Sequence, residues 1–318
     1  MTKPLPIATR TSPLATTQTK DVQARLAAAT GRTAETDFPI LGMQTTGDRI
    51  TDRALLAAGG KGLFTKELDA ALLSGEARFA VHSMKDVPTK LPEGLEIAAI
   101  LEREDPRDVL ITSGEIYRVD DLPEGAVLGT ASIRRQAQAL RRRPDLRIVL
   151  LRGNVDTRLE KIRSGEIDAT FLARAGLRRL GRAEAEREPV SDTEMIPAPA
   201  QGCVGVAIRS DDDEAREIAA LINHAESHVR ARAERGFLAA LDGSCRTPIA
   251  AHAAFGADGK VHLRGEALST DGTACWADSV IADIGMDPHA AEDVGRTLGA
   301  AVKKAGGADL AAIVEQTG

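Results

Sequence analysis

Residues 79–88 read FAVHSMKDVP, an apolar run that stops abruptly at Ser83, Lys85 and Asp86. The run predicts a β-strand with polar side chains at its carboxyl end, and the closing proline prevents its continuation as a central strand. Open α/β sheets bind ligands beyond the carboxyl ends of their strands, so these three side chains are candidate functional residues. A solvated loop in which Lys85 and Asp86 pair with each other explains the stretch equally well.

The composition predicts a soluble globular protein of two or three domains, because 43% of its 318 residues are hydrophobic and 28% are charged. Charged residues come too early for a signal peptide and no apolar run approaches ~18 residues, so we expect a cytoplasmic protein without a membrane span. The net charge of −6 and an aromatic content of 3% disfavour nucleic-acid binding. Three cysteines without CxxC spacing argue against disulfides and zinc, and we expect no metal.

A second candidate site follows the first apolar stretch of the chain. Residues 4–9 are predicted as a short strand that leads to Arg10, after which Ser12 and Pro13 supply a helix N-cap and first turn. The backbone N–H groups at this helix start, together with Arg10, are suited to an anion. An ordinary capped helix needs no such ligand.

Residues 47–62 include three glycines close to Lys61. They predict a mobile loop, because the spacing of a Walker phosphate loop is absent. Beyond the loop, Phe64, Leu68 and residues 71–72 recur at helical spacing, which favours a buried helix face.

An arginine-rich region begins after the charged segment 102–108, which we interpret as a linker. Residues 131–182 hold thirteen arginines and one lysine against five acidic residues, a local balance of 14 − 5 = +9 that favours an anionic partner. Within this region a helix is predicted to start near residues 130–132, which places Arg134 and Arg135 in its first turn. Cations there oppose the helix dipole, so an anion is their expected partner. Residues 141–143 lie near the helix end and are predicted to be solvated.

Two further strand ends carry cations. The predicted strand 148–151 leads to Arg152 and to a helix with Arg158, and the strand 169–173 leads to Arg179. A second linker at 196–202 precedes a returning strand at 204–208, so the chain is expected to leave a first domain, build a second and return. The predicted domains are 1–101 with 203–222, then 108–196, and finally 225–318.

The last predicted domain is a small α+β unit with an antiparallel sheet. Its strands are expected at 248–254, 261–267 and 275–283, before a helix at 288–304. Cys245 lies in a glycine-containing loop before the first strand, where a reactive thiol and a buried inert one are both open. Cys203 and Cys275 occupy apolar, strand-like contexts and are predicted to be inert.

Taken together, these stretches resemble the hydroxymethylbilane synthase (porphobilinogen deaminase) family nearly end to end. The similar segments are IATRTSPLA (7–15), GGKGLFTKELD (59–69), AVHSMKDVPT (80–89), EREDPRD (102–108), GTASIRRQ (129–136), LRGNVDTRL (151–159), AGLRRLG (175–181), PAQGCVG (199–205) and LDGSCRTPI (241–249). Two departures are Ser244, where a second glycine is common, and Ala57, where some members carry a lysine.

The resemblance implies two periplasmic-binding-protein-like α/β domains that form a cleft, plus a small C-terminal α+β domain. It implies a monomeric transferase of tetrapyrrole (haem) biosynthesis that joins four porphobilinogen molecules head to tail, releases ammonia and yields linear hydroxymethylbilane. A dipyrromethane cofactor would be attached to Cys245 through a thioether, and a thiolate is well suited to capture an electrophilic methylene-pyrrolenine.

The resemblance also assigns roles to residues. Asp86 would be the catalytic carboxylate, because an ionised carboxylate near the ring nitrogens stabilises positive charge and moves protons. The remaining expectations group the other polar residues: cofactor binding by Ser83, Lys85, Thr130, Ser132, Arg134 and Arg135; substrate binding by Arg10, Ser12, Arg152, Arg158 and Arg179; and a lid at 47–62 with Lys61 and Phe64. The alternatives are a non-enzymatic two-domain module for small anions and, more weakly, a nucleic-acid binder through residues 134–147.

Overall fold

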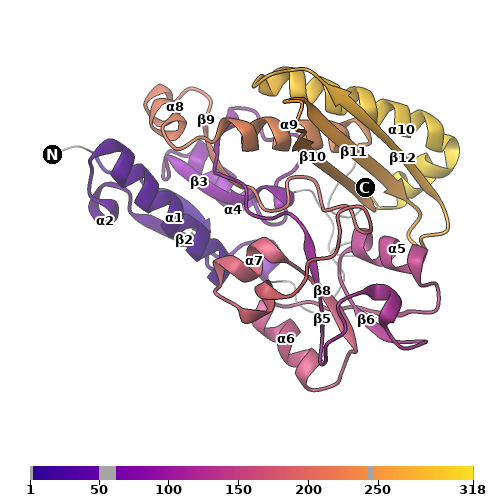
Figure 1. The fold of residues 1–318 in the computed structure, drawn as a ribbon. Helices are drawn as coiled ribbons and strands as arrows, with labels where there is room; N and C mark the ends of the chain where they lie inside the picture. Colours follow the sequence, from indigo (N-terminus) through magenta and orange to yellow (C-terminus); the bar gives the residue numbers. More distant parts are fainter. Residues whose placement is uncertain (1–2, 50–61, 243–246, 318) are drawn as a thin grey trace. The chain divides into compact units, whose positions relative to one another are not determined.

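The computed structural model describes residues 3–49, 62–242 and 247–317 and divides the chain into two compact units. The first unit comprises residues 1–50, 60–104 and 202–228, and the second comprises residues 51–59, 105–201 and 229–318. Figure 1 shows the chain in sequence colours. Lys61 and Cys245 lie outside the described residues, as does most of the predicted lid.

The first unit is built on a five-stranded sheet of order β2-β1-β3-β9-β4. Strands β1, β2 and β3 run parallel, whereas β9 is antiparallel to both of its neighbours. The carboxyl ends of the three parallel strands therefore meet at one sheet edge. The strands are β1 (Ile7–Arg10), β2 (Ile40–Met43), β3 (Phe79–Ser83), β4 (Leu95–Ile100) and β9 (Val204–Arg209). The helices are α1 (Pro13–Thr30), α2 (Ala34–Asp37), α3 (Thr46–Arg49), α4 (Lys66–Leu73), the 3₁₀ turn η2 (Met84–Asp86) and α8 (Asp213–Ala220).

Local signals decide where α1 begins and ends. The Ser12 side chain caps the helix by accepting a hydrogen bond from the Ala15 N–H, Pro13 occupies the first turn, and Gly31 ends the helix with φ of 67°. Its inner face packs Val22 and Leu26, both fully buried, against the sheet. The predicted start of this helix is confirmed.

The second unit holds a four-stranded sheet of order β5-β8-β6-β7 and an antiparallel sheet of order β10-β11-β12. The first sheet consists of β5 (Asp108–Thr112), β6 (Val127–Gly129), β7 (Arg147–Val149) and β8 (Ala169–Ala173), with α5 (Ile133–Arg142), α6 (Val155–Arg163), α7 (Arg174–Arg179), η3 (Val119–Asp121) and η4 (Ala183–Glu186). The second consists of β10 (Ile249–Phe255), β11 (Val261–Leu268) and β12 (Cys275–Ala282), with α9 (Ala225–Ala240) and α10 (Pro288–Thr317), whose course breaks at Gly307. The predicted fold class, two α/β parts and a C-terminal α+β part, is confirmed.

Three local predictions were wrong. Phe64 precedes α4 instead of continuing its buried face, which is formed by Leu68 and its neighbours. Arg143 is not simply solvated, because its guanidinium donates to four carbonyl groups between residues 119 and 123. Cys275 is half-buried beside charged groups, not in an apolar setting.

Within the described part of the chain, no helix has the length and apolar character needed to cross a membrane. The same described residues contain no group of three His, Cys, Asp or Glu side chains arranged to hold a metal ion.

Candidate functional site

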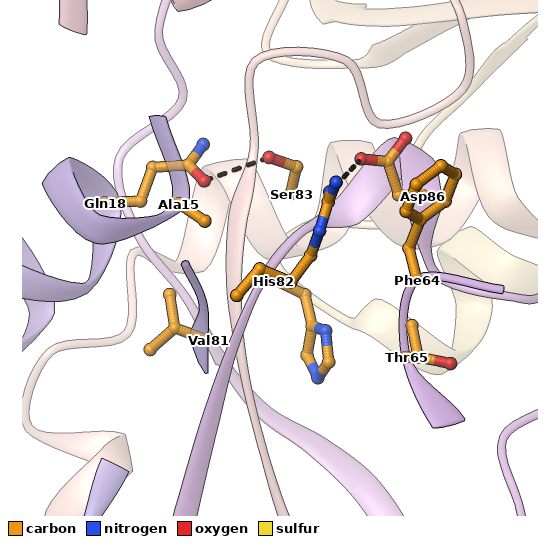
Figure 2. Close-up of a pocket in the computed structure, with 9 residues that line it drawn as sticks. Ala15, Gln18, Phe64, Thr65, Val81, His82, Ser83 and Asp86 are labelled. Atoms are coloured by element: carbon orange, nitrogen blue, oxygen red, sulfur yellow. Dashed lines mark hydrogen bonds and ion pairs between the residues drawn. The ribbon is translucent and has the colours of Figure 1, made fainter. Parts of the chain in front are cut away.

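A pocket, which we call the Arg10 pocket, lies at the carboxyl edge of the first unit's sheet, where β1 and β3 end. Its lining includes Arg10 from the end of β1, Ser83 and Asp86 from the end of β3 and η2, Gln18 from α1, and Phe64. Figure 2 labels Gln18, Phe64, Ser83 and Asp86 among the residues that line the pocket. The parallel arrangement of the strands thus brings together residues that are far apart in the sequence.

Arg10 is held by three groups in this pocket. Its guanidinium donates two hydrogen bonds to Asp48, one of them from Nε to Oδ2 at 3.2 Å. Nη1 lies 3.7 Å from Oδ2 of Asp86, and Cζ lies 4.4 Å from the centroid of the Phe64 ring. Burial lowers the pKa of Arg10, but the hydrogen bond with Asp48 and the charge of Asp86 outweigh it and raise that pKa overall. Arg10 is therefore a firmly charged cation next to Asp86.

Asp48 is a member of the site that the sequence analysis missed. The Thr45 hydroxyl donates to its Oδ2 at 2.7 Å, and Arg10 forms an ion pair with it. Burial raises the pKa of Asp48, yet these hydrogen bonds lower it overall. Gly47, its neighbour, admits the aromatic ring of Phe64, because an added Cβ would lie 2.4 Å from that ring. Asp48 falls within the predicted loop 47–62, but no local pattern indicates Arg10, 38 positions away, as its partner.

The two serines predicted as site residues in the first unit, Ser83 and Ser12, use their hydroxyl groups differently. Ser83 Oγ donates to Oε1 of Gln18 at 3.0 Å, which joins the end of β3 to α1 (Figure 2). Ser12 Oγ accepts the N–H of Ala15 at 3.4 Å, so this hydroxyl serves as a helix cap. Lys85 is half-buried in η2 between Ser83 and Asp86.

The second unit contains a buried charge cluster, which we call the Asp108 cluster: Asp108, Arg134, Arg135 and Gln201. Arg134 Nη2 and Arg135 Nη2 each lie 2.7 Å from an oxygen of Asp108, and Arg135 Nε donates to it at 3.2 Å. Gln201 Nε2 adds a fourth donor at 2.9 Å. Because β5 pairs with β8 so that Asp108 lies opposite Ala173, this carboxylate lies at the carboxyl end of β8. The sequence placed both arginines in the first turn of α5 but gave no sign of Asp108 as their partner.

The Asp108 cluster fits an additional anionic group. Two guanidinium groups face one carboxylate, and the Nε of Arg134 is buried without a hydrogen-bond partner. Burial raises the pKa of Asp108, but the charges of Arg135 and Arg134 lower it well below its usual range. Burial is also the main reason that the pKa of Arg134 is lowered, since the nearby charge of Asp108 only partly offsets it. A carboxylate of a bound cofactor would supply the missing negative charge.

Thr130 and Arg152 follow β6 and β7, whose carboxyl ends lie at the same sheet edge because β6 runs parallel to both β7 and β8. Thr130 Oγ1 accepts the N–H of Ser132, and Ser132 caps α5. Arg158 Nε donates to the carbonyl of Gly153 at 3.0 Å. Arg152 follows β7, and Arg179 is the last residue of α7. Their roles as ligand-binding residues stay predictions.

Comparison with known proteins identifies the family. The family model described as "Porphobilinogen deaminase, dipyromethane cofactor binding domain" matches residues 5–217, and "Porphobilinogen deaminase, C-terminal domain" matches residues 228–304. The chain belongs to the porphobilinogen deaminase family. The dipyrromethane-binding part of this family covers the Arg10 pocket and the Asp108 cluster alike.

Porphobilinogen deaminases of bacteria and of a plant resemble the chain over most of its length. The protein of Phenylobacterium zucineum is 51% identical over 310 residues, which covers 95% of this chain and 96% of the relative. That of Paracoccus denitrificans is 51% identical over 270 residues, or 85% of each chain, and the chloroplastic protein of Oryza sativa is 48% identical over 276 residues, or 86% and 76%. Among solved structures, the periplasmic VFT2 domain of Bordetella pertussis BvgS covers 69% of this chain at 19% identity, with 86% of that domain covered and a TM-score of 0.41.

Membership of the porphobilinogen deaminase family decides between the functions that the sequence left open. The chain is an enzyme of tetrapyrrole biosynthesis with a dipyrromethane cofactor, and a non-enzymatic anion-binding module is not favoured. The particular residues that perform the reaction are a separate question.

Proposed function

We propose that Asp86 is the catalytic carboxylate with which this chain joins four porphobilinogen molecules head to tail, with release of ammonia at each addition. Hydrolysis by water then releases the product as linear hydroxymethylbilane. The observation that carries the proposal is its position in the Arg10 pocket, at the carboxyl edge of a parallel sheet. Its side chain keeps 30% of its surface exposed, so a ligand can reach the carboxylate.

Asp86 has two tasks in this proposal. When ammonia leaves a porphobilinogen, the pyrrole becomes positively charged, and the ionised carboxylate of Asp86 stabilises that charge. After the new carbon–carbon bond forms, a proton must leave the ring, and the same carboxylate accepts it. Arg10, 3.7 Å away, keeps the carboxylate oriented without closing it off.

Arg10 binds the substrate's acetate or propionate group. A guanidinium presents five N–H donors in a planar fork that matches a carboxylate, and Asp48 takes two of them here. The contact with Phe64 fixes the plane of the fork. Ser12, Arg152, Arg158 and Arg179 assist in holding the substrate and the growing chain, and the segment 47–62 with Lys61 and Phe64 forms a lid.

A separate set of residues is proposed to bind the dipyrromethane. Ser83, Lys85, Thr130, Ser132, Arg134 and Arg135 bind its polar groups, and the thiol of Cys245 forms the thioether. When bound, the dipyrromethane supplies the pyrrole end to which substrate is added. Support comes from the excess positive charge of the Asp108 cluster and from the family of the chain.

The surroundings of Cys275 support the choice of Cys245. Arg141 Nη1 donates to Cys275 Sγ at 2.9 Å, and Oε2 of Glu266 lies 3.7 Å from that sulfur. Burial and the charge of Glu266 raise the pKa of the Cys275 thiol to about 11, which keeps it protonated and weakly nucleophilic at neutral pH. Cys203 is fully buried.

Intact-mass spectrometry of the denatured protein tests the proposal. We expect a covalent excess equal to two linked pyrroles, lost in Cys245→Ser and retained in the matched control Cys275→Ser. An active protein without this excess would contradict the attachment. We also propose a cytoplasmic monomer, which cell fractionation and sedimentation would check.

A further inference from the structure

The Asp108 carboxylate is saturated with hydrogen bonds. Oδ1 accepts from Arg135 Nη2 and Gln201 Nε2, while Oδ2 accepts from Arg134 Nη2 and Arg135 Nε. An ionised carboxylate offers about four acceptor sites, so this one has no acceptor site left for a ligand donor. Its side chain is fully buried, and the reaction described above does not use it.

The two arginines, in contrast, keep unused donors. Arg134 donates to Asp108 and to the Ile196 carbonyl, and Arg135 donates twice to Asp108 and once to the Phe171 carbonyl. Each guanidinium has five N–H donors, so five of the ten remain. The bonds to Asp108 lock both planes, and the side chains keep 5% and 7% of their surface exposed.

We infer that Asp108 is a positioning residue: it fixes the guanidinium groups of Arg134 and Arg135 so that their remaining N–H donors receive a carboxylate of the dipyrromethane. This inference rests on the proposed function. It extends the proposed function by assigning a role to Asp108, which orients the cofactor-binding arginines but has no acceptor site left to bind the cofactor itself. Gln201 belongs to the same arrangement, since it ties Asp108 to the Pro106 carbonyl at 2.6 Å.

Asp105 offers a matched control from the same segment. It is a half-buried carboxylate that also pairs with two arginines, Arg107 at 2.7 Å and Arg174 at 3.0 Å. These two arginines are not members of the Asp108 cluster. Asp105→Asn therefore removes a comparable ion pair and leaves the proposed cofactor groups in place.

The test compares wild type, Asp108→Asn and Asp105→Asn as full-length proteins. Each protein is produced in the absence of porphobilinogen, so that it starts without the covalent excess. Porphobilinogen is then added, and the gain of the two-pyrrole mass is followed by denaturing mass spectrometry at a temperature where all three are folded by circular dichroism. Misplaced binding groups cost about tenfold or more, so we expect Asp108→Asn to gain the mass at least about tenfold more slowly and Asp105→Asn to match wild type. Equal rates for Asp108→Asn and wild type would overturn the inference.

A second variant covers the case in which Asp108→Asn fails to fold. Asp108→Glu keeps the charge but moves the carboxylate by one methylene, so a positioning role still predicts slow gain of the mass. A wild-type rate in Asp108→Glu would show that charge alone suffices and would overturn the inference. Absence of the two-pyrrole mass from wild type would instead remove the proposed function, which is a distinguishable result.

Discussion

The Arg10 pocket and the Asp108 cluster both pair arginine with aspartate at the carboxyl edge of a sheet, yet they differ in how firmly the charges are fixed. Arg10 and Asp86 keep 21% and 30% of their side-chain surface exposed and lie 3.7 Å apart. Arg134 and Arg135 are almost fully buried, and each lies 2.7 Å from a buried carboxylate. Arg10 can therefore release Asp86 and bind a ligand instead. Arg134 and Arg135 cannot release Asp108 without a large free-energy cost, because the carboxylate would be left buried and unpaired.

This difference indicates how one protein can bind a substrate reversibly at one site and hold a group permanently at another. A substrate that binds and dissociates in every catalytic cycle needs cations that are exposed and only weakly bound to other side chains. Each hydrogen bond between such a cation and a protein carboxylate must be replaced when the substrate binds. A group that stays bound benefits from donors whose orientation is already fixed. The Arg10 pocket suits the first need and the Asp108 cluster the second.

The largest expected effect tests the catalytic half of the comparison. Asp86→Ala should leave a folded protein whose kcat falls by about 10²–10⁴, the range for loss of a general acid–base group. Product formation and a thermal melt measure the two properties separately. Glu96→Ala is a matched control, because Glu96 is similarly exposed and pairs with Arg216 at 2.8 Å. Substantial activity in Asp86→Ala would remove the assignment.

A smaller effect is expected when lysine replaces Arg10, because the positive charge is kept and the planar guanidinium group is lost. Arg10→Lys removes the planar fork shared with Asp48, so kcat/KM should fall about tenfold to a hundredfold. Steady-state kinetics measure the change, and Arg216→Lys provides a control at another arginine of the same unit. An unchanged kcat/KM would mean that charge, and not geometry, matters in this pocket.

Loss of a cation from the second unit's sheet edge should affect chain growth more than the fold. We expect Arg152→Leu to slow elongation by roughly tenfold, because one charged hydrogen-bonding group to the growing polyanion is lost. Mass spectrometry of the protein during turnover should then show accumulated intermediates. The control is Arg163→Leu, at an exposed surface position of α6. Normal kinetics and normal product length in Arg152→Leu would contradict the role.

The smallest effect concerns stability in acid. Burial raises the pKa of Asp105, but hydrogen bonds from Arg107 and the other nearby donors lower it to about 2. A carboxyl group with a lowered pKa in the folded state stabilises the fold above its unfolded pKa near 4, and this contribution is lost as the pH falls toward 2. We expect Asp105→Asn to flatten the decline in unfolding free energy over this interval by on the order of 1 kcal/mol, since solvent screens the pair. Denaturant titrations from pH 5 to pH 2 measure it, and an unaltered slope would contradict the expectation.

The sequence predicted most elements because their signals are local. Ser12 with Pro13 marks the start of α1, and Ser132 marks the start of α5, since a capping side chain and the backbone it caps are neighbours in the chain. The strand ends at Arg10 and Ser83 followed from abrupt changes of polarity. The prediction that Phe64 belongs to the buried face of a helix is wrong, because helical spacing alone cannot distinguish a residue in the helix from one that precedes it.

The sequence by itself determined which polar residues follow strands and helix starts, and therefore most residues of both candidate sites. It did not indicate Asp48, Asp108, Gln18 or Gln201. Only the tertiary structure decided which charges meet. Asp108 lies 26 positions from Arg134, and Asp48 lies 38 positions from Arg10. Ion pairs between residues so far apart in the sequence depend on strand order and register, which bring the ends of different strands to one edge of a sheet. Local residue patterns do not reveal strand order or register.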